Sequence, residues 1–230
     1  SIENLSVYNA DFTAILALRT IGFQAKKINI YGAGVNSSRS PEADGIRILE
    51  SRNFLLEDIV IRDKAQSGIV FGGGIFNGTV RDISFQNIGS SLFTGAFTMW
   101  TDAGVDVPSA DINNLDFEGD FTFMNCSNGF VLEATENRSI NIDADNVSST
   151  FSGIENADIL RYDIGVTPDL YQFGKDFGLN YVGVLGLVQG LEALYQNLDS
   201  MLTEAQNPLY VNSAICKNLD QTTYYLRGNM

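Results

Sequence analysis

The chain has 230 residues, 44% of them hydrophobic, so it is long enough to bury a sizeable core and is not a disordered tail. Its formal net charge of −14 predicts repulsion from nucleic acids and anionic membrane surfaces, which leaves glycans, cations and other proteins as candidate partners. It contains no histidine and no run of about 18 apolar residues, which excludes histidine-ligated zinc sites, histidine-based hydrolysis and membrane insertion.

The chain begins at Ser1 without an initiator methionine or a signal peptide, so we expect a processed product or a piece of a longer chain. Its two cysteines, Cys126 and Cys216, form neither a metal-binding spacing nor a disulfide framework. Six sequons hint at a secretory route, although turns that simply favour asparagine would explain them as well: Asn4, Asn36, Asn77, Asn125, Asn137 and Asn146.

Six eight-residue segments repeat from the N-terminus onward: Ile2–Asn9, Ala25–Gly32, Leu56–Asp63, Val80–Asn87, Ile112–Gly119 and Ser139–Asn146. Their fourth and sixth places are apolar almost throughout, and this alternation predicts a half-buried strand in each. Their eighth place is always Asn, Gly or Asp. These residues tolerate a left-handed backbone, so each strand should end at a corner.

A small residue followed by alternating apolar residues comes after each segment and predicts a second strand, starting near Ala14, Gly45, Gly68, Gly95, Gly129 and Gly153. Repeats of 23 to 32 residues with two strands each predict a mainly β fold, a right-handed parallel β-helix of about six rungs over residues 1–158. A β-sandwich with coincidental spacing is the alternative. Loops that should cluster along one edge are expected at Ala33–Ala43, Ile88–Thr94 and Asp120–Asn128, and a further loop at Thr101–Ala110.

Residues 159–230 are expected to form a separate, partly helical C-terminal segment. Apolar residues at three-four spacing predict a helix near residues 184–204: Val184, Leu187, Leu191, Leu194, Leu198 and Met201. This helix would either cover the open end of the solenoid or form a coiled coil that joins three subunits.

Four carboxylates on the outward places of the last two repeats should share one patch: Asp116, Glu118, Asp143 and Asp145. Neighbouring like charges invite a cation or a raised pKa, so we consider a calcium site and an acid/base pair for glycoside chemistry. A solvated acidic face is the simpler interpretation.

Trp100, the only tryptophan, is followed by Asp102 and Asp106. An aromatic ring beside carboxylates is a common arrangement for binding sugars, although Trp100 could also be a core residue at a strand end. Asp44 precedes Gly45 at a junction of loop and strand, where it is a further ligand-binding candidate or simply a turn residue.

The stretch Glu42–Ile48, followed by Asn53–Ile59, resembles the pectin-lyase-like β-helix superfamily. Polygalacturonase-type hydrolases of this superfamily carry Asn-Thr-Asp-Gly here, and only Asp44 and Gly45 match. Their Asp-Asp pair is replaced by Ala65–Gly68 and their Gly-His-Gly motif is absent, which argues against that mechanism.

Pectate lyases resemble the acidic patch more closely, since they bind calcium through carboxylates on a strand face. Their basic residue has no clear counterpart, because Arg62 lies two rungs from Asp116. A β-helix followed by a trimerising segment is most similar to the layout of viral tailspikes and fibres.

We therefore expect an extracellular or virion-surface protein that recognises carbohydrate without catalysis, as a possible homotrimer. The alternatives are a polysaccharide lyase or glycoside hydrolase using the four carboxylates, with or without calcium, and a structural capsid or coat component that contacts neighbouring subunits.

Overall fold

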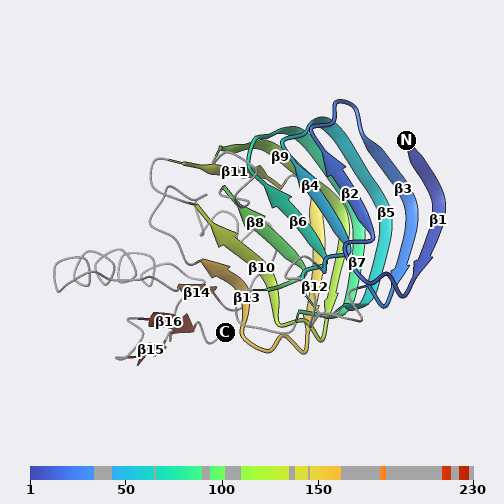
Figure 1. Ribbon diagram of the computed structural model, residues 1–230. Helices are drawn as coiled ribbons and strands as arrows, with labels where there is room; N and C mark the ends of the chain where they lie inside the picture. Colours follow the sequence, from blue (N-terminus) through green and yellow to red (C-terminus); the bar gives the residue numbers. More distant parts are fainter. Residues whose placement is uncertain are drawn as a thin grey trace.

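The computed structural model describes residues 1–33, 43–64, 66–89, 94–101, 110–134, 138–144 and 146–161, together with three short strands nearer the C-terminus (Figure 1). All the regular elements within these residues are β-strands. No helix among them is long and apolar enough to cross a membrane.

The first sheet has seven parallel strands: β1 (Ile2–Tyr8), β3 (Gln24–Tyr31), β5 (Arg52–Lys64), β7 (Ile75–Ile88), β9 (Ile112–Met124), β11 (Ile140–Asp143) and β12 (Val147–Ser152). Each strand pairs with the next in this order, except that β11 and β12 both pair with β9, one after the other along its length. The long strands β5, β7 and β9 are therefore matched by two shorter strands in the last repeat.

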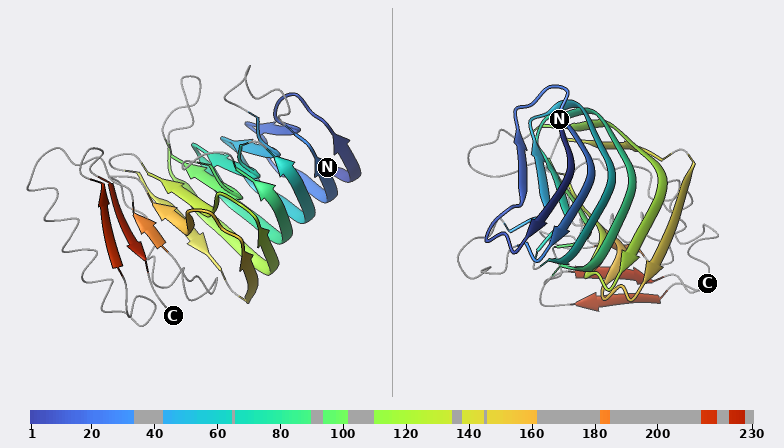
Figure 2. Two further views of the ribbon diagram at one scale, coloured as in Figure 1. Left: turned by 90° about the horizontal axis from the view of Figure 1, so that it is seen from below. Right: turned by 90° about the vertical axis from the view of Figure 1, so that its right-hand side faces the viewer.

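The second sheet has seven parallel strands followed by an antiparallel pair: β2 (Ile15–Leu18), β4 (Ile46–Leu49), β6 (Ile69–Gly72), β8 (Phe97–Trp100), β10 (Asn128–Glu133), β13 (Ala157–Arg161) and β14 (Val182–Val184), then β16 (Thr223–Arg227) and β15 (Ala214–Asn218). The chain alternates between the two sheets, and we call a first-sheet strand with the following second-sheet strand a rung. Figure 2 shows the strands of both sheets following one another along the same direction.

The first four repeats align as the sequence predicts. The inward pair Leu5 and Val7 of β1 lies opposite Ile28 and Ile30 of β3, and the same register continues into β5 and β7. These inward side chains are buried from β3 onward.

The predicted alignment of the fifth repeat with the fourth is wrong. Leu115 lies opposite Gly78, and the true partners of Ile83 and Phe85 are Phe121 and Phe123. Both β7 and β9 contain the same alternating pattern twice, so the sequence match selected the first half of β9 instead of its second. The sixth repeat pairs with the fifth as predicted, so both are displaced in the same way relative to the first four repeats.

Two further predictions fail for the same reason. Asp120–Met124, expected in a loop, belongs to β9. Gly153, expected to open a second strand, lies at a corner beside Asn125, and the strand is β13 instead. Most of the other expected loops, residues 34–42, 90–93 and 102–109, lies outside the described residues.

The predicted left-handed conformation at the eighth place is confirmed, but β9 does not end there as expected, because it continues past Gly119 to Met124. All six residues at the eighth place have φ between 51° and 80°: Asn9, Gly32, Asp63, Asn87, Gly119 and Asn146. Further left-handed residues, such as Asp58 and Asp82, bend the long strands midway. A single residue in this conformation turns a strand sharply, so these positions fix where each rung folds around the core.

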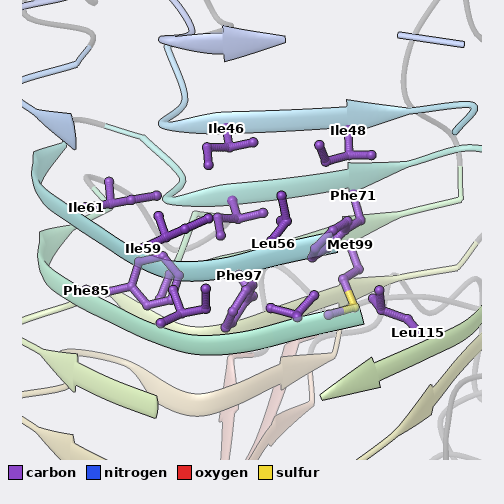
Figure 3. Close-up of a cluster of buried hydrophobic side chains, with 14 of the residues drawn as sticks. Ile46, Ile48, Leu56, Ile59, Ile61, Phe71, Phe85, Phe97, Met99 and Leu115 are labelled. Carbon is purple, nitrogen blue, oxygen red and sulfur yellow. The ribbon is translucent and has the colours of Figure 1, made fainter. Parts of the chain in front are cut away.

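The core lies between the two sheets and consists mainly of isoleucine and phenylalanine side chains. Phe97 of β8 contacts Phe71, Phe85 and Phe130 with ring centroids 6.3, 4.8 and 5.2 Å away. Figure 3 shows Phe71, Phe85 and Phe97 meeting between strands of both sheets. Each ring bridges neighbouring rungs, so the core is continuous along the stack.

The small residues before the second strands are confirmed as a packing requirement. A Cβ atom at Gly68 would lie 2.5 Å from Cε1 of Phe85 and 2.6 Å from the carbonyl oxygen of Ala96. Gly45 and Gly129 are constrained in the same way by the neighbouring strand and by a side chain of the first sheet. Small residues therefore let the two sheets approach at this edge.

The second sheet extends beyond the expected domain boundary at residue 158. Strand β13 crosses it, and β14 pairs in parallel with β13. The helix expected near residues 184–204 lies outside the described residues, apart from Val184 at the end of β14. Cys126 is a buried free thiol, and burial raises its pKa to about 11, so it is a poor nucleophile.

Candidate functional site

Asp116 and Asp143 lie side by side on the outer face of the first sheet. They are paired residues of the parallel strands β9 and β11, and both are exposed. Thr79 of β7 occupies the place on the other side of Asp116. The corrected register therefore keeps this predicted pair of neighbouring carboxylates together.

Glu118 belongs to a different set of neighbours. Oε2 of Glu118 accepts hydrogen bonds from both Nη2 and Nε of Arg81, at 2.6 and 3.1 Å. Arg81 in turn reaches Glu57 at 3.2 Å, and Glu57 pairs with Lys26 at 3.0 Å. These side chains form a charge ladder of alternating sign across neighbouring strands: Glu3, Lys26, Glu57, Arg81 and Glu118.

The charge ladder changes the acidity of its members. The hydrogen bond from Lys26 holds the pKa of Glu57 below its ordinary value, with a smaller contribution from Arg81. The hydrogen bond and charge of Glu118 raise the pKa of Arg81. Glu118 is thus compensated by a cation, unlike the open acidic patch expected from the sequence.

The fourth predicted carboxylate, Asp145, lies outside the described residues. In the part of the chain that the structure describes, no three carboxylate or cysteine side chains come close enough to hold a metal ion. Asp116 and Asp143 would need another ligand to bind calcium, because calcium takes six to eight oxygen atoms.

Asp44 is buried in an ion pair. Its Oδ2 lies 2.6 Å from Nη2 and 2.8 Å from Nε of Arg47, and the two side chains are only 2% and 7% exposed. Its Oδ1 accepts a hydrogen bond from the backbone N–H of Ser67 in the next rung, at 3.2 Å. Both carboxylate oxygens of Asp44 are therefore used in contacts within the fold, one with Arg47 and one with the next rung. Removing the charge of either Asp44 or Arg47 would leave the other charge buried and uncompensated.

Trp100 ends β8 with its side chain on the outer face of the second sheet. Phe97 and Met99 alternate with it and point into the core, whereas Trp100 is half-buried. Its neighbours in register are Gly72 of β6, which has no side chain, and Glu133 of β10. An indole ring and a carboxylate thus occupy neighbouring places at the ends of β8 and β10, whereas Val70, Thr98 and Val131, which precede this row on the same face, are fully buried.

Asp102 and Asp106, the expected companions of Trp100, lie outside the described residues. Glu133 was missed because the sequence alignment matched Gly95 with Gly129, whereas the structure matches Ala96 with Gly129. Trp100 is the fourth residue after Ala96 and Glu133 is the fourth after Gly129, so the two lie opposite each other in the sheet. The position of Arg81 beside Glu118 was missed for a different reason, the larger displacement of β9 against β7.

A second aromatic feature lies near the N-terminal end of the first sheet. The rings of Tyr8 and Tyr31 stack with centroids 5.2 Å apart and an angle of 11° between their planes. The guanidinium of Arg62 covers the other side of Tyr31, 6.0 Å from its ring centroid. Only the outer face of Tyr8 is open in this stack, and Tyr8 is 67% exposed.

Comparisons with protein-family models, curated proteins and solved structures find no match to this chain.

Proposed function

We propose that the chain is a right-handed parallel β-helix of the pectin-lyase-like kind, displayed on a virion or cell surface, where it recognises carbohydrate. The alternation of the chain between two sheets of in-register parallel strands supports the β-helix. Residues 159–230 are proposed to join three copies, as in tailspikes and fibres.

The placement of Trp100 carries the proposed carbohydrate binding. Sugar rings present a flat apolar face and a rim of hydroxyl groups, so they favour an aromatic ring beside a hydrogen-bond acceptor. Trp100 would supply the ring and Glu133 the acceptor, and Gly72 on the other side of Trp100 adds no side chain. Because the chain carries a net charge of −14, neutral glycans are favoured over anionic ones.

The state of Arg81 supports binding without catalysis. A lyase needs a basic group that can take a proton from the substrate. Arg81 is the basic side chain nearest in register to the acidic pair, and it is held between Glu57 and Glu118 with a raised pKa. A guanidinium in this state is a poor proton acceptor.

The test is a titration with neutral oligosaccharides followed by intrinsic fluorescence, since Trp100 is the only tryptophan. Saturable change in its emission is expected, and Trp100→Ala should weaken binding about thirty-fold, as for a typical aromatic hot spot. Trp100→Phe should retain part of the affinity. Phe76→Ala, which removes an aromatic side chain that is 47% exposed elsewhere, should change nothing. Binding that leaves Trp100 emission unchanged would refute this site.

The alternative of a polysaccharide lyase or glycoside hydrolase is favoured by one observation, the paired exposed carboxylates of Asp116 and Asp143. Under this alternative, Asp116→Asn and Asp143→Asn would each abolish release of shortened chains from a polysaccharide, with or without added calcium. Under carbohydrate recognition alone, both variants bind glycan as the parent chain does.

A further inference from the structure

The outer face of β8 and β10 is accessible to solvent only at the ends of these strands (Figure 1). The outward side chains of Thr98 and Val131 are fully buried, whereas Trp100 and Glu133, two residues further along the same strands, are half-buried. A ligand at this row therefore approaches the strand ends and does not extend back over the covered face. Such a place fits one terminal group of a ligand better than the middle of a long chain.

The segment that supplies this row is rich in acidic residues and free of basic ones. Between Arg81 and Arg138 the sequence contains nine acidic residues and neither lysine nor arginine. Arg81 itself is bound within the charge ladder of the first sheet. The next strand of the second sheet, β13, aligns Arg161 with Leu132 and not with Glu133. The charge of this segment therefore attracts cations and repels anions.

An indole ring and a carboxylate on neighbouring strands complement a ligand that combines a flat apolar face with a positive charge. Among aromatic side chains, tryptophan attracts cations to its ring face most strongly. A carboxylate accepts charge-assisted hydrogen bonds, which are stronger than those between neutral groups. Neighbouring parallel strands lie about 4.8 Å apart, so one sugar residue can contact both side chains.

We propose that this row binds an amino sugar whose ring stacks on Trp100 and whose protonated amine donates hydrogen bonds to Glu133. The inference rests on the proposed carbohydrate binding at Trp100 and deepens it by naming the class of sugar. A neutral sugar can use the indole ring and a carboxylate oxygen. An amino sugar adds the ion pair with Glu133 and the attraction of the surrounding acidic segment.

The probes are two β-1,4-linked oligosaccharides of equal length, one of glucosamine and one of N-acetylglucosamine, which share their rings and differ in charge. Each is titrated into the full chain at about pH 6, where glutamate is ionised and the sugar amines are protonated. The emission of Trp100 is followed. The glucosamine oligomer should bind about ten-fold more tightly than the acetylated one.

Glu133→Gln keeps an oxygen that accepts hydrogen bonds and removes the charge. It should leave the affinity for the acetylated oligomer nearly unchanged, which also shows that the variant folds, and reduce the preference for the glucosamine oligomer to about two-fold. Asp120→Asn is the matched control, because it removes an exposed charge of the same acidic segment from β9 in the first sheet. This control variant should keep most of the preference.

Equal affinity of the parent chain for both oligomers would overturn the inference and leave carbohydrate binding at Trp100 standing. A preference that survives Glu133→Gln, or that Asp120→Asn removes equally, would overturn it too, because the whole acidic segment would then be the cause. Displacement of the glucosamine oligomer by an equal concentration of spermine, an amine without a sugar ring, would contradict the assignment to an amino sugar. If neither oligomer changes the emission of Trp100, the proposed carbohydrate site itself is wrong.

Discussion

Asparagine and aspartate residues at the corners of the first sheet combine a left-handed backbone with side-chain hydrogen bonds. Asn87 has φ of 55°, donates a hydrogen bond from Nδ2 to Asp63 at 2.7 Å, and accepts one from Asn125 at 3.3 Å. A parallel ladder joins Asn53, Asn77 and Asn114. Glycine would allow the backbone conformation but could not form these bonds.

Replacement of Asn87 separates the two contributions. Asn87→Gly keeps an unstrained corner and loses the hydrogen bonds, so it should cost about 1 kcal/mol of unfolding free energy. Asn87→Ala also places a Cβ atom on a left-handed backbone and should cost about 1 kcal/mol more. Urea unfolding of both variants measures this difference, and equal stability of the two would contradict the strain argument.

At the scale of elements, the structure differs from the sequence prediction in how the strands at the candidate site pair. The alternating pattern predicts which residues of a strand face the core, as in β3 and β5. The same pattern recurs after any even shift, so it does not fix which half of β9 lies against Ile83. That choice separates Glu118 from the expected patch and places it against Arg81.

The charge ladder across these strands makes stability depend on pH through Glu57. Its folded-state pKa lies below the ordinary value of 4.5, so its contribution is fully present above about pH 4.5 and is lost as the pH falls through the folded-state pKa. Glu57→Gln should therefore be less stable than the parent at pH 7, and the difference should vanish in acid.

Urea unfolding of both proteins between pH 2 and pH 7 measures this loss. In a Lys26→Gln background the effect of Glu57→Gln should be smaller, because the hydrogen bond that contributes most to the lowered pKa is gone. A pH-independent difference between the parent and Glu57→Gln would show that the ladder is not electrostatically coupled.

At the scale of the whole molecule, charge and core are distributed differently. The first 88 residues carry nine acidic and nine basic side chains, so the net charge of −14 comes entirely from the rest of the chain. The phenylalanine core runs across both parts. The rungs formed by the first 88 residues are therefore balanced in charge, and they expose apolar side chains such as Leu16 and Ile21.

Phe97 tests whether the rungs unfold as one unit. It is fully buried and contacts rings from four neighbouring strands, so Phe97→Ala should cost about 3–5 kcal/mol of unfolding free energy. The whole urea transition should move to a lower urea concentration as a single step, without a separate early phase. Phe76→Ala, at a 47% exposed side chain, should cost about 0.5 kcal/mol or less.

The sequence by itself determined the strands, their inward residues and the left-handed corners, because alternation and Asn, Gly or Asp at a fixed place are local properties of the chain. It also predicted Asp116 beside Asp143, and the alternation of Phe97 and Met99, aligned with that of Phe130 and Leu132, contains the match of Trp100 with Glu133. Only the tertiary structure decided the register of β9 and the burial of Asp44 against Arg47. These depend on contacts between residues far apart in sequence, which a pattern of period two leaves undetermined.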